Sequence, residues 1–393
     1  MLEHIEIFSQ AIEWFKKTKK EVNGVEGWGD RGADNRITAV NTAEAIMGLV
    51  FAGAEKHLIK NEIEQLKTNL LNSINRLEKG EKPVYYDFYG FPRQVCWPGI
   101  AMLIAGEEDW HILDKIADFL RKIKNNDGGW GYSLSKKSKK KVKNEKISNT
   151  FSTSLVLWFA SLAGEKYDDL KKDAKKWLMK AFNKRGWGWH PKENENPAAT
   201  AYALIALKEA GVSESNKKIK KALKYLEESS WDNIQGPEGE AREKVILYTH
   251  FTRAWASIAL LKWGTRSRKV ENEIRNIVNL RITNPDDDDY GGFSASLGEP
   301  ARTWATMQAI FALRLFFENL SSDLMKILDY IINIRKIKKD AEDEVKERMI
   351  RFLGHDSLLF SKKAYLIFSV NAFIIYIFAS LLIFLLGTSI VNN

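Results

Sequence analysis

The feature that most constrains the fold of this chain is an internal repeat. In five of six copies, an apolar run ends at a glycine eleven residues after the first position of the copy. The copies begin at Thr42, Val95, Thr153, Thr200, Arg253 and Thr306, with separations of 53, 58, 47, 53 and 53 residues. A period of this length is typical of stacked supersecondary units that each contact their neighbours.

The copies are built from the same three parts, and four of them show all three. Four copies follow a turn of glycine and an aromatic residue, at 27–29, 128–131, 186–189 and 291–293. Before each turn lies an amphipathic segment; in 170–182 the apolar residues form one stripe opposite lysines. The segment after the turn is apolar nearly all round, so it is expected to be buried on both sides. Each copy therefore predicts an outer helix, a turn and an inner helix.

Six such helix pairs fill residues 1–320, and we expect them to form one all-α domain. A stack of helix pairs either stays open with polar caps or curls until its ends meet. Because the first and last copies show no polar capping face, the sequence favours a closed ring.

The carboxyl-terminal part has a different composition. Residues 321–361 form a charged helical pattern, which predicts a solvated linker or a short partner-binding helix. In 362–393, the 24 residues from Ala364 to Gly387 carry no charge, enough to cross a bilayer core of about 30 Å as a helix. Lys362 and Lys363 precede this segment, which predicts a single-pass membrane protein with its amino-terminal domain in the cytoplasm. A buried core helix is the alternative.

Composition narrows the classes of partner. Cys96 is the single cysteine, so an internal disulfide framework is excluded and no cysteine pair exists to bind a metal. The net charge of +9 does not require a nucleic acid. The basic run 136–146 lacks the aromatic residues typical of single-strand binding and predicts a solvated loop or contact with anionic lipid. We expect no metal, no cofactor and no nucleic acid.

The GGWG turn at 128–131, followed by an apolar helix with a Thr-Ala pair in other copies, resembles the repeat of the terpenoid cyclase and protein prenyltransferase superfamily, which includes squalene-hopene cyclase-like proteins. The resemblance covers roughly residues 1–320 and implies an α/α toroid with a central cavity, often holding an isoprenoid. On the expected inner helices, the residues that would line such a cavity are Trp158, Tyr202, Trp255, Trp304 and Gln308.

The catalytic motifs of that superfamily are not found where it places them. Its class II cyclases carry a protonating DxDD motif directly before the Thr-Ala pair, and no copy here has a carboxylate at that place. Asp286, Asp288 and Asp289 belong to a DDDD run before the GGF turn, which is a solvated turn, a cation site or a displaced catalytic acid. Glu44, on an expected inner helix, is an arginine partner or a proton donor.

The zinc-dependent prenyltransferases of the superfamily use an Asp-x-Cys pair and a later histidine. His250, in YTHFTRAW, resembles the histidine part, but the pair is missing, so no metal site is expected. Cys96 is better explained as a packed thiol.

Basic residues gather at the starts of the expected inner helices: Arg93, Arg253 and Arg302, with His250. Arginine at a helix amino terminus requires a nearby anion. The candidates are local carboxylates at Glu240, Glu243 or Glu299, and the phosphate or diphosphate headgroup of a ligand.

Two functions follow as hypotheses. In the first, the ring binds an isoprenoid or lipid-like ligand at the membrane surface, and any reaction is of the terpenoid cyclase or prenyltransferase type. A class II cyclase using Asp286 to Asp289 is a variant of this hypothesis. In the second, the ring is a non-catalytic, membrane-tethered module for a peptide or partner protein.

Overall fold

The computed structural model describes residues 2–32, 36–85, 88, 91–131, 148–241 and 244–319. These residues lie in one compact unit, Met1–Asn333; a second unit, Ile334–Asn393, falls outside them. The described part contains six inner helices: α2 (Ala39–Phe51), α4 (Pro92–Ile104), α6 (Thr150–Ala163), α8 (Pro197–Glu209), α10 (Thr252–Lys262) and α12 (Thr303–Glu318). The outer helices are α1 (Leu2–Thr18), α3 (Lys60–Lys79), α5 (Trp110–Ile123), α7 (Asp168–Ala181), α9 (Lys217–Glu228) and α11 (Arg268–Val278). Short 3₁₀ helices η1 (Lys56–Leu58) and η2 (Glu165–Tyr167) complete the helical elements.

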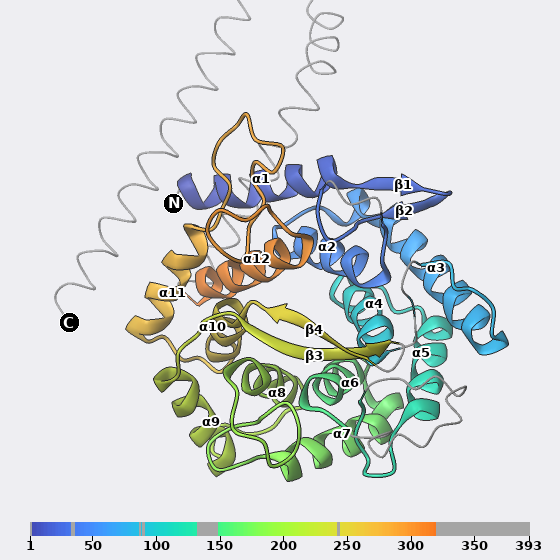
Figure 1. The fold of residues 1–393 in the computed structure, drawn as a ribbon, viewed down its shortest axis with the longest axis vertical. Coiled ribbons are helices and arrows are strands. Elements are labelled where there is room, and N and C mark those ends of the chain that lie inside the picture. Colours follow the sequence, from blue (N-terminus) through green and yellow to red (C-terminus); the bar gives the residue numbers. More distant parts are fainter. Residues whose placement is uncertain are drawn as a thin grey trace, which may run out of the picture. The chain divides into compact units, whose positions relative to one another are not determined.

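The inner helices form a closed ring. Each packs against the next along the chain, and α12 packs against α2, so the last copy meets the first (Figure 1). At this seam the Thr303 amide donates to the Asp30 carbonyl at 2.9 Å, and the Thr303 hydroxyl donates to the Gly29 carbonyl at 2.6 Å. The prediction of an α/α toroid is therefore confirmed for the described residues.

The turns explain the repeated motif. In four copies a threonine hydroxyl at the first position accepts a hydrogen bond from the backbone amide of the turn aromatic residue. The pairs are Thr42 with Trp28, Thr153 with Trp130, Thr200 with Trp187 and Thr306 with Phe293, at 2.9–3.2 Å. The three tryptophan indoles donate to carbonyls of the preceding outer helix, at Phe15, Leu120 and Leu178. Each turn thus ties one outer helix to one inner helix.

Glycine in these turns is a steric requirement. At Gly186 a Cβ atom would lie 2.6 Å from the Thr200 hydroxyl oxygen, well inside van der Waals contact. The turn can reach the threonine only because glycine leaves this space free.

Two antiparallel hairpins correct the expectation of a purely helical domain. One joins β1 (Lys20–Val22) to β2 (Val25–Gly27). The other joins β3 (Ile234–Ala241) to β4 (Lys244–His250) and has an irregularity between Pro237 and Gly239. The second hairpin occupies the place of the glycine-aromatic turn in the fifth copy, and it crosses the middle of the ring in Figure 1.

Among the described residues, no helix has the length and apolar character needed to cross a membrane. The expected span Ala364–Gly387, the charged segment 321–361 and the basic run 136–146 lie outside the described residues. The predictions made for them stay predictions.

Candidate functional site

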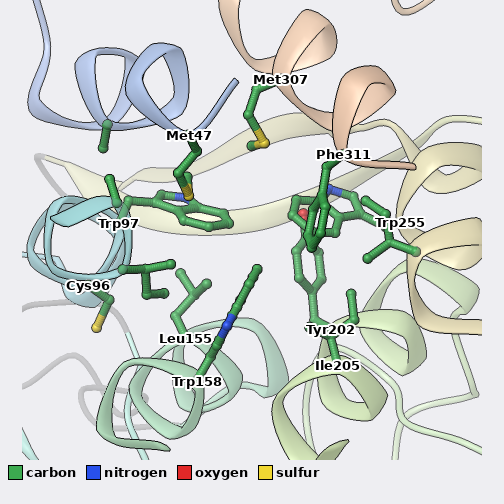
Figure 2. Close-up of a cluster of buried hydrophobic side chains, with 14 of the residues drawn as sticks. Met47, Cys96, Trp97, Leu155, Trp158, Tyr202, Ile205, Trp255, Met307 and Phe311 are labelled. Atoms are coloured by element: carbon green, nitrogen blue, oxygen red, sulfur yellow. The ribbon is translucent and has the colours of Figure 1, made fainter. Parts of the chain in front are cut away.

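Side chains from all six inner helices converge on the middle of the ring. The residues two positions after the start of each copy are Glu44, Trp97, Leu155, Tyr202, Trp255 and Gln308. One turn further along, the equivalent residues are Met47, Ile100, Trp158, Ile205, Ile258 and Phe311. Figure 2 shows most of these side chains pointing toward one another. Polar residues are thus confined to the layer nearer the helix amino termini.

Aromatic side chains fill the middle of the ring. Trp97 of α4 and Trp255 of α10 come from opposite sides of the ring, and their ring centroids stack 5.9 Å apart. Trp158 meets both edge-on, at 5.6 and 6.4 Å, and stacks on Phe311 (Figure 2). All four side chains are buried, with 5% exposure at most. A ligand that enters this level therefore has to displace aromatic side chains.

Glu44 lies in the layer nearer the amino termini of the inner helices and forms a buried ion pair there. Its Oε1 lies 3.9 Å from Nη2 of Arg93, and its Oε2 accepts a hydrogen bond from the side-chain Nδ2 of Asn41 at 3.2 Å. Glu44 is 1% exposed. Taking both charges out of water is costly, and removing one partner would leave the other charge buried and uncompensated. The pair is therefore a candidate for function rather than for stability.

His250 lies beside this ion pair, at the end of β4. Its Nδ1 is 3.1 Å from the Tyr202 hydroxyl, and its ring packs against Trp189 and Phe151. Burial, and secondarily the nearby charge of Arg93, lower the pKa of His250 to about 3. The imidazole is therefore neutral at physiological pH and acts as a hydrogen-bonding group, not as a cation.

Asn41, Glu44, Arg93, Tyr202 and His250 together form the polar group of this site. Two further polar atoms lie in the same layer. Trp255 Nε1 and Gln308 Oε1 are buried and have no hydrogen-bond partner among the described residues. One is a donor and the other an acceptor, on neighbouring helices α10 and α12. Buried polar atoms of this kind are normally satisfied, so they indicate a bound molecule or water.

Hairpin β3–β4 covers the polar group. A Cβ atom on Gly236 would lie 2.3 Å from Trp189 Cζ2 and 2.7 Å from His250 Nε2. The β3 backbone therefore rests directly on both rings, and only glycine allows this approach.

Each arginine expected at an anion site pairs with a different carboxylate of the chain. Arg253 pairs with Glu273 of α11 at 2.7 Å, Arg302 pairs with Asp30 at 2.6 Å, and Arg93 pairs with Glu44. Of the two candidate anions named from the sequence, a local carboxylate is therefore present beside each arginine. These carboxylates are Glu273, Asp30 and Glu44, and the expected Glu299 is not among them. The side chains of Glu240 and Glu243 fall outside the described residues, so the expectation for them stays untested. Trp304 is partly buried and lies 6.0 Å from the Arg302 guanidinium.

The acidic run lies on an exposed turn between α11 and α12. Asp286 is exposed, and Asp288 forms an exposed ion pair with Lys17 of α1 at 3.3 Å. Asp289 accepts from the Trp14 indole at 3.4 Å and from the Ala301 amide at 3.0 Å. This placement favours a structural role that joins α1 to the turn, and the catalytic role stays a prediction.

Within the described ranges, no group of three or more histidine, cysteine or acidic residues is arranged to hold a metal. Cys96 is fully buried, and this burial raises the pKa of its thiol well above the ordinary value. It behaves as a packed side chain.

Sequence reasoning missed three members of the site. Asn41 precedes the threonine that begins the first copy, and Trp189 ends the GWGW turn, so both had a signal in their repeat positions. Gly236 lay in a hairpin that the repeat pattern did not indicate.

Comparisons with known proteins add evidence on the fold. No protein-family model matches the chain, and no curated protein matches its sequence. Among solved structures, an α-1,6-mannanase from Salegentibacter sp. HEL1_6 is similar, with a TM-score of 0.53 and 11% identity over 80% of this chain and 99% of that one. A type II terpene cyclase from Scytonema is similar with a TM-score of 0.51 and 14% identity, over 80% and 98%. An unsaturated glucuronyl hydrolase from a streptococcus gives 0.50 and 12%, over 80% and 92%. At these identities the likeness shows the α/α-toroid fold alone, a fold common to glycosidases and terpene cyclases.

Proposed function

We propose that the ring binds an elongated, mainly apolar ligand, isoprenoid or lipid-like, whose polar end reaches the polar group beneath hairpin β3–β4. The observation that carries this proposal is the pair of unpartnered, buried polar atoms, Trp255 Nε1 and Gln308 Oε1, in an otherwise aromatic interior. A ligand hydroxyl group could accept from the Trp255 indole and donate to the Gln308 amide oxygen, and the hydrocarbon part of the ligand would pack on the tryptophans.

The composition of the interior favours an apolar ligand over a saccharide. The deeper layer consists of Met47, Ile100, Trp158, Ile205, Ile258 and Phe311. None of these side chains except the Trp158 indole can donate or accept a strong hydrogen bond. A sugar chain would leave its hydroxyl groups unpaired at this level, at a cost for each group.

The ligand would have to move two features. Trp158 and Phe311 would adopt other rotamers, because they pack on each other in the middle of the ring. Strand β3 would move away from the rings of Trp189 and His250, because its backbone at Gly236 lies in contact with both. The proposed function is binding, and no reaction is assigned to Glu44.

Mass spectrometry of organic extracts tests this proposal on the full-length chain purified in detergent. The wild type is expected to retain one class of apolar molecule at close to one per chain. Gln308→Leu removes the unpartnered acceptor at similar volume, and it should lower the occupancy about tenfold. Gln65→Leu, at an exposed position of α3, is the matched control and should retain the ligand.

Extracts that contain no such molecule, or equal occupancy in Gln308→Leu and the wild type, would contradict ligand binding at this site. A second function, the non-catalytic module for a peptide or partner protein, is favoured by the contact between Trp97 and Trp255 across the ring. A packed centre serves a scaffold without any ligand. Empty extracts, together with capture of the same protein partner by the wild type and by Gln308→Leu, would support the second function.

A further inference from the structure

The outer helices do not share the positive charge equally. Helices α7 and α9 together carry ten lysines and five carboxylates. The other four outer helices, α1, α3, α5 and α11, together carry twelve basic and ten acidic residues. Two of six outer helices thus hold an excess of five positive charges, against two on the remaining four.

The lysines of α7 and α9 lie on one continuous outer surface. The apolar side of each helix is buried toward the ring, through Trp177 and Leu178 in α7 and Ile219 and Leu226 in α9. The lysines are left on the opposite side. A hydrogen bond of 2.6 Å from Lys218 Nζ to the Met179 carbonyl joins the two helices. Lys224 of α9 is also exposed, but it lies 3.7 Å from Glu228, so we name the other six exposed lysines the basic face: Lys172, Lys176, Lys180, Lys217, Lys220 and Lys221.

Neighbouring cations are neutralised, whereas those of the basic face are not. In the adjoining part of the ring, Arg121 pairs with Asp169 at 2.7 Å and Lys124 pairs with Asp173 at 2.6 Å. These pairs use two of the three aspartates of α7. Within the described residues, no carboxylate lies within ion-pair distance of any lysine of the basic face. The face therefore retains its full charge toward solvent.

We infer that the basic face docks on the surface of a bilayer that contains anionic lipid. Lysine ammonium groups are compact, strongly hydrated point charges, which suit a diffuse negative surface better than a bidentate contact. Several lysines on one face add their attractions to such a surface. The uncharged segment Ala364–Gly387 is a predicted membrane span, and as such it would hold the chain near a bilayer. This inference is independent of the proposed ligand.

The test measures lysine accessibility in the full-length chain reconstituted into vesicles. One preparation contains phosphatidylcholine alone, and the other contains about one-third phosphatidylserine; both are treated with an amine-reactive reagent and analysed by mass spectrometry. The lysines of the basic face should be labelled at least about threefold less in the anionic vesicles, and high salt should restore the labelling. Lys60 and Lys79 of α3 are internal references and should be labelled equally in both.

Charge reversal provides the matched comparison. The triple variant Lys172→Glu, Lys176→Glu and Lys180→Glu should abolish the protection of the α9 lysines. The same change of charge on α3, in Lys60→Glu, Arg76→Glu and Lys79→Glu, should leave that protection intact. Equal labelling in the two vesicle types, or equal loss of protection in both variants, would overturn the inference. Protection by an added nucleic acid instead of by anionic vesicles would also overturn it.

Discussion

The burial of His250 makes the stability of the ring depend on pH. Folding lowers the pKa of this imidazole from its ordinary 6.5 to about 3, chiefly because the ring loses its water and secondarily because Arg93 is near. At pH values between these two pKa values, the unfolded chain binds a proton at His250 that the folded chain does not bind. The stability contributed by the neutral histidine is therefore complete above pH 6.5 and is lost as the pH falls. The expected loss in free energy of unfolding is about 1 kcal/mol for each pH unit below that value.

Urea denaturation at several pH values between about 7 and 4.5 measures this loss. His250→Gln keeps a hydrogen-bonding side chain that does not titrate, so its free energy of unfolding should fall with a slope lower by about 1 kcal/mol per pH unit. His57→Gln, which changes a histidine exposed by 69%, should follow the wild type. Aspartate and glutamate titration contributes equally to all three proteins and cancels in the comparison. Identical slopes for the wild type and His250→Gln would show that the buried imidazole is not the source of acid sensitivity.

Three further sets of substitutions test the contacts of the ring. Gly236→Ala places a methyl group against Trp189 and should lift hairpin β3–β4, seen as faster amide hydrogen exchange in residues 234–250, with a loss of about 1–3 kcal/mol. Trp255→Ala should cost about 3–5 kcal/mol in thermal unfolding, because it leaves a cavity in the aromatic interior. Trp255→Phe should cost much less, because phenylalanine keeps part of the packing and removes the unpartnered indole N–H. Equal costs for the two changes would contradict the packing described. Asp289→Ala should cost about 1–3 kcal/mol, whereas Asp288→Ala, at an exposed site, should stay within about 0.5 kcal/mol of the wild type. Similar effects of these two changes would refute the structural role of Asp289.

The ring could be predicted because its contacts are local to each repeat. The spacing between Gly186 and Thr200, for instance, is fixed by one hydrogen-bonded turn that recurs at similar positions elsewhere in the chain. Hairpin β3–β4 could not be predicted from the repeat, because it replaces the turn of one copy. A local signal did exist in the β-branched and aromatic run of residues 245–249.

The sequence predicted several residues of the candidate site but not how their side chains contact one another. Glu44 and Arg93 were both singled out, but their pairing joins residues of neighbouring inner helices and depends on how those helices pack. His250 was expected to join the arginines at the rim of the ring. Its neutral state follows from burial against strand β3 of the hairpin, which only the folded structure shows. The packing of Trp97 against Trp255 depends on side-chain rotamers, which a repeat period does not determine.

The seam between Gly29 and Thr303 also sets the order in which the domain can mature. These residues are 274 positions apart, so the bond that joins them cannot form before α12 has left the ribosome. At a synthesis rate of about 5–20 residues per second, the flank of α2 that α12 covers waits roughly 15–50 s for its partner. During that interval the nascent arc exposes an apolar edge at each end. We therefore expect newly made chains to engage chaperones until the last helix arrives.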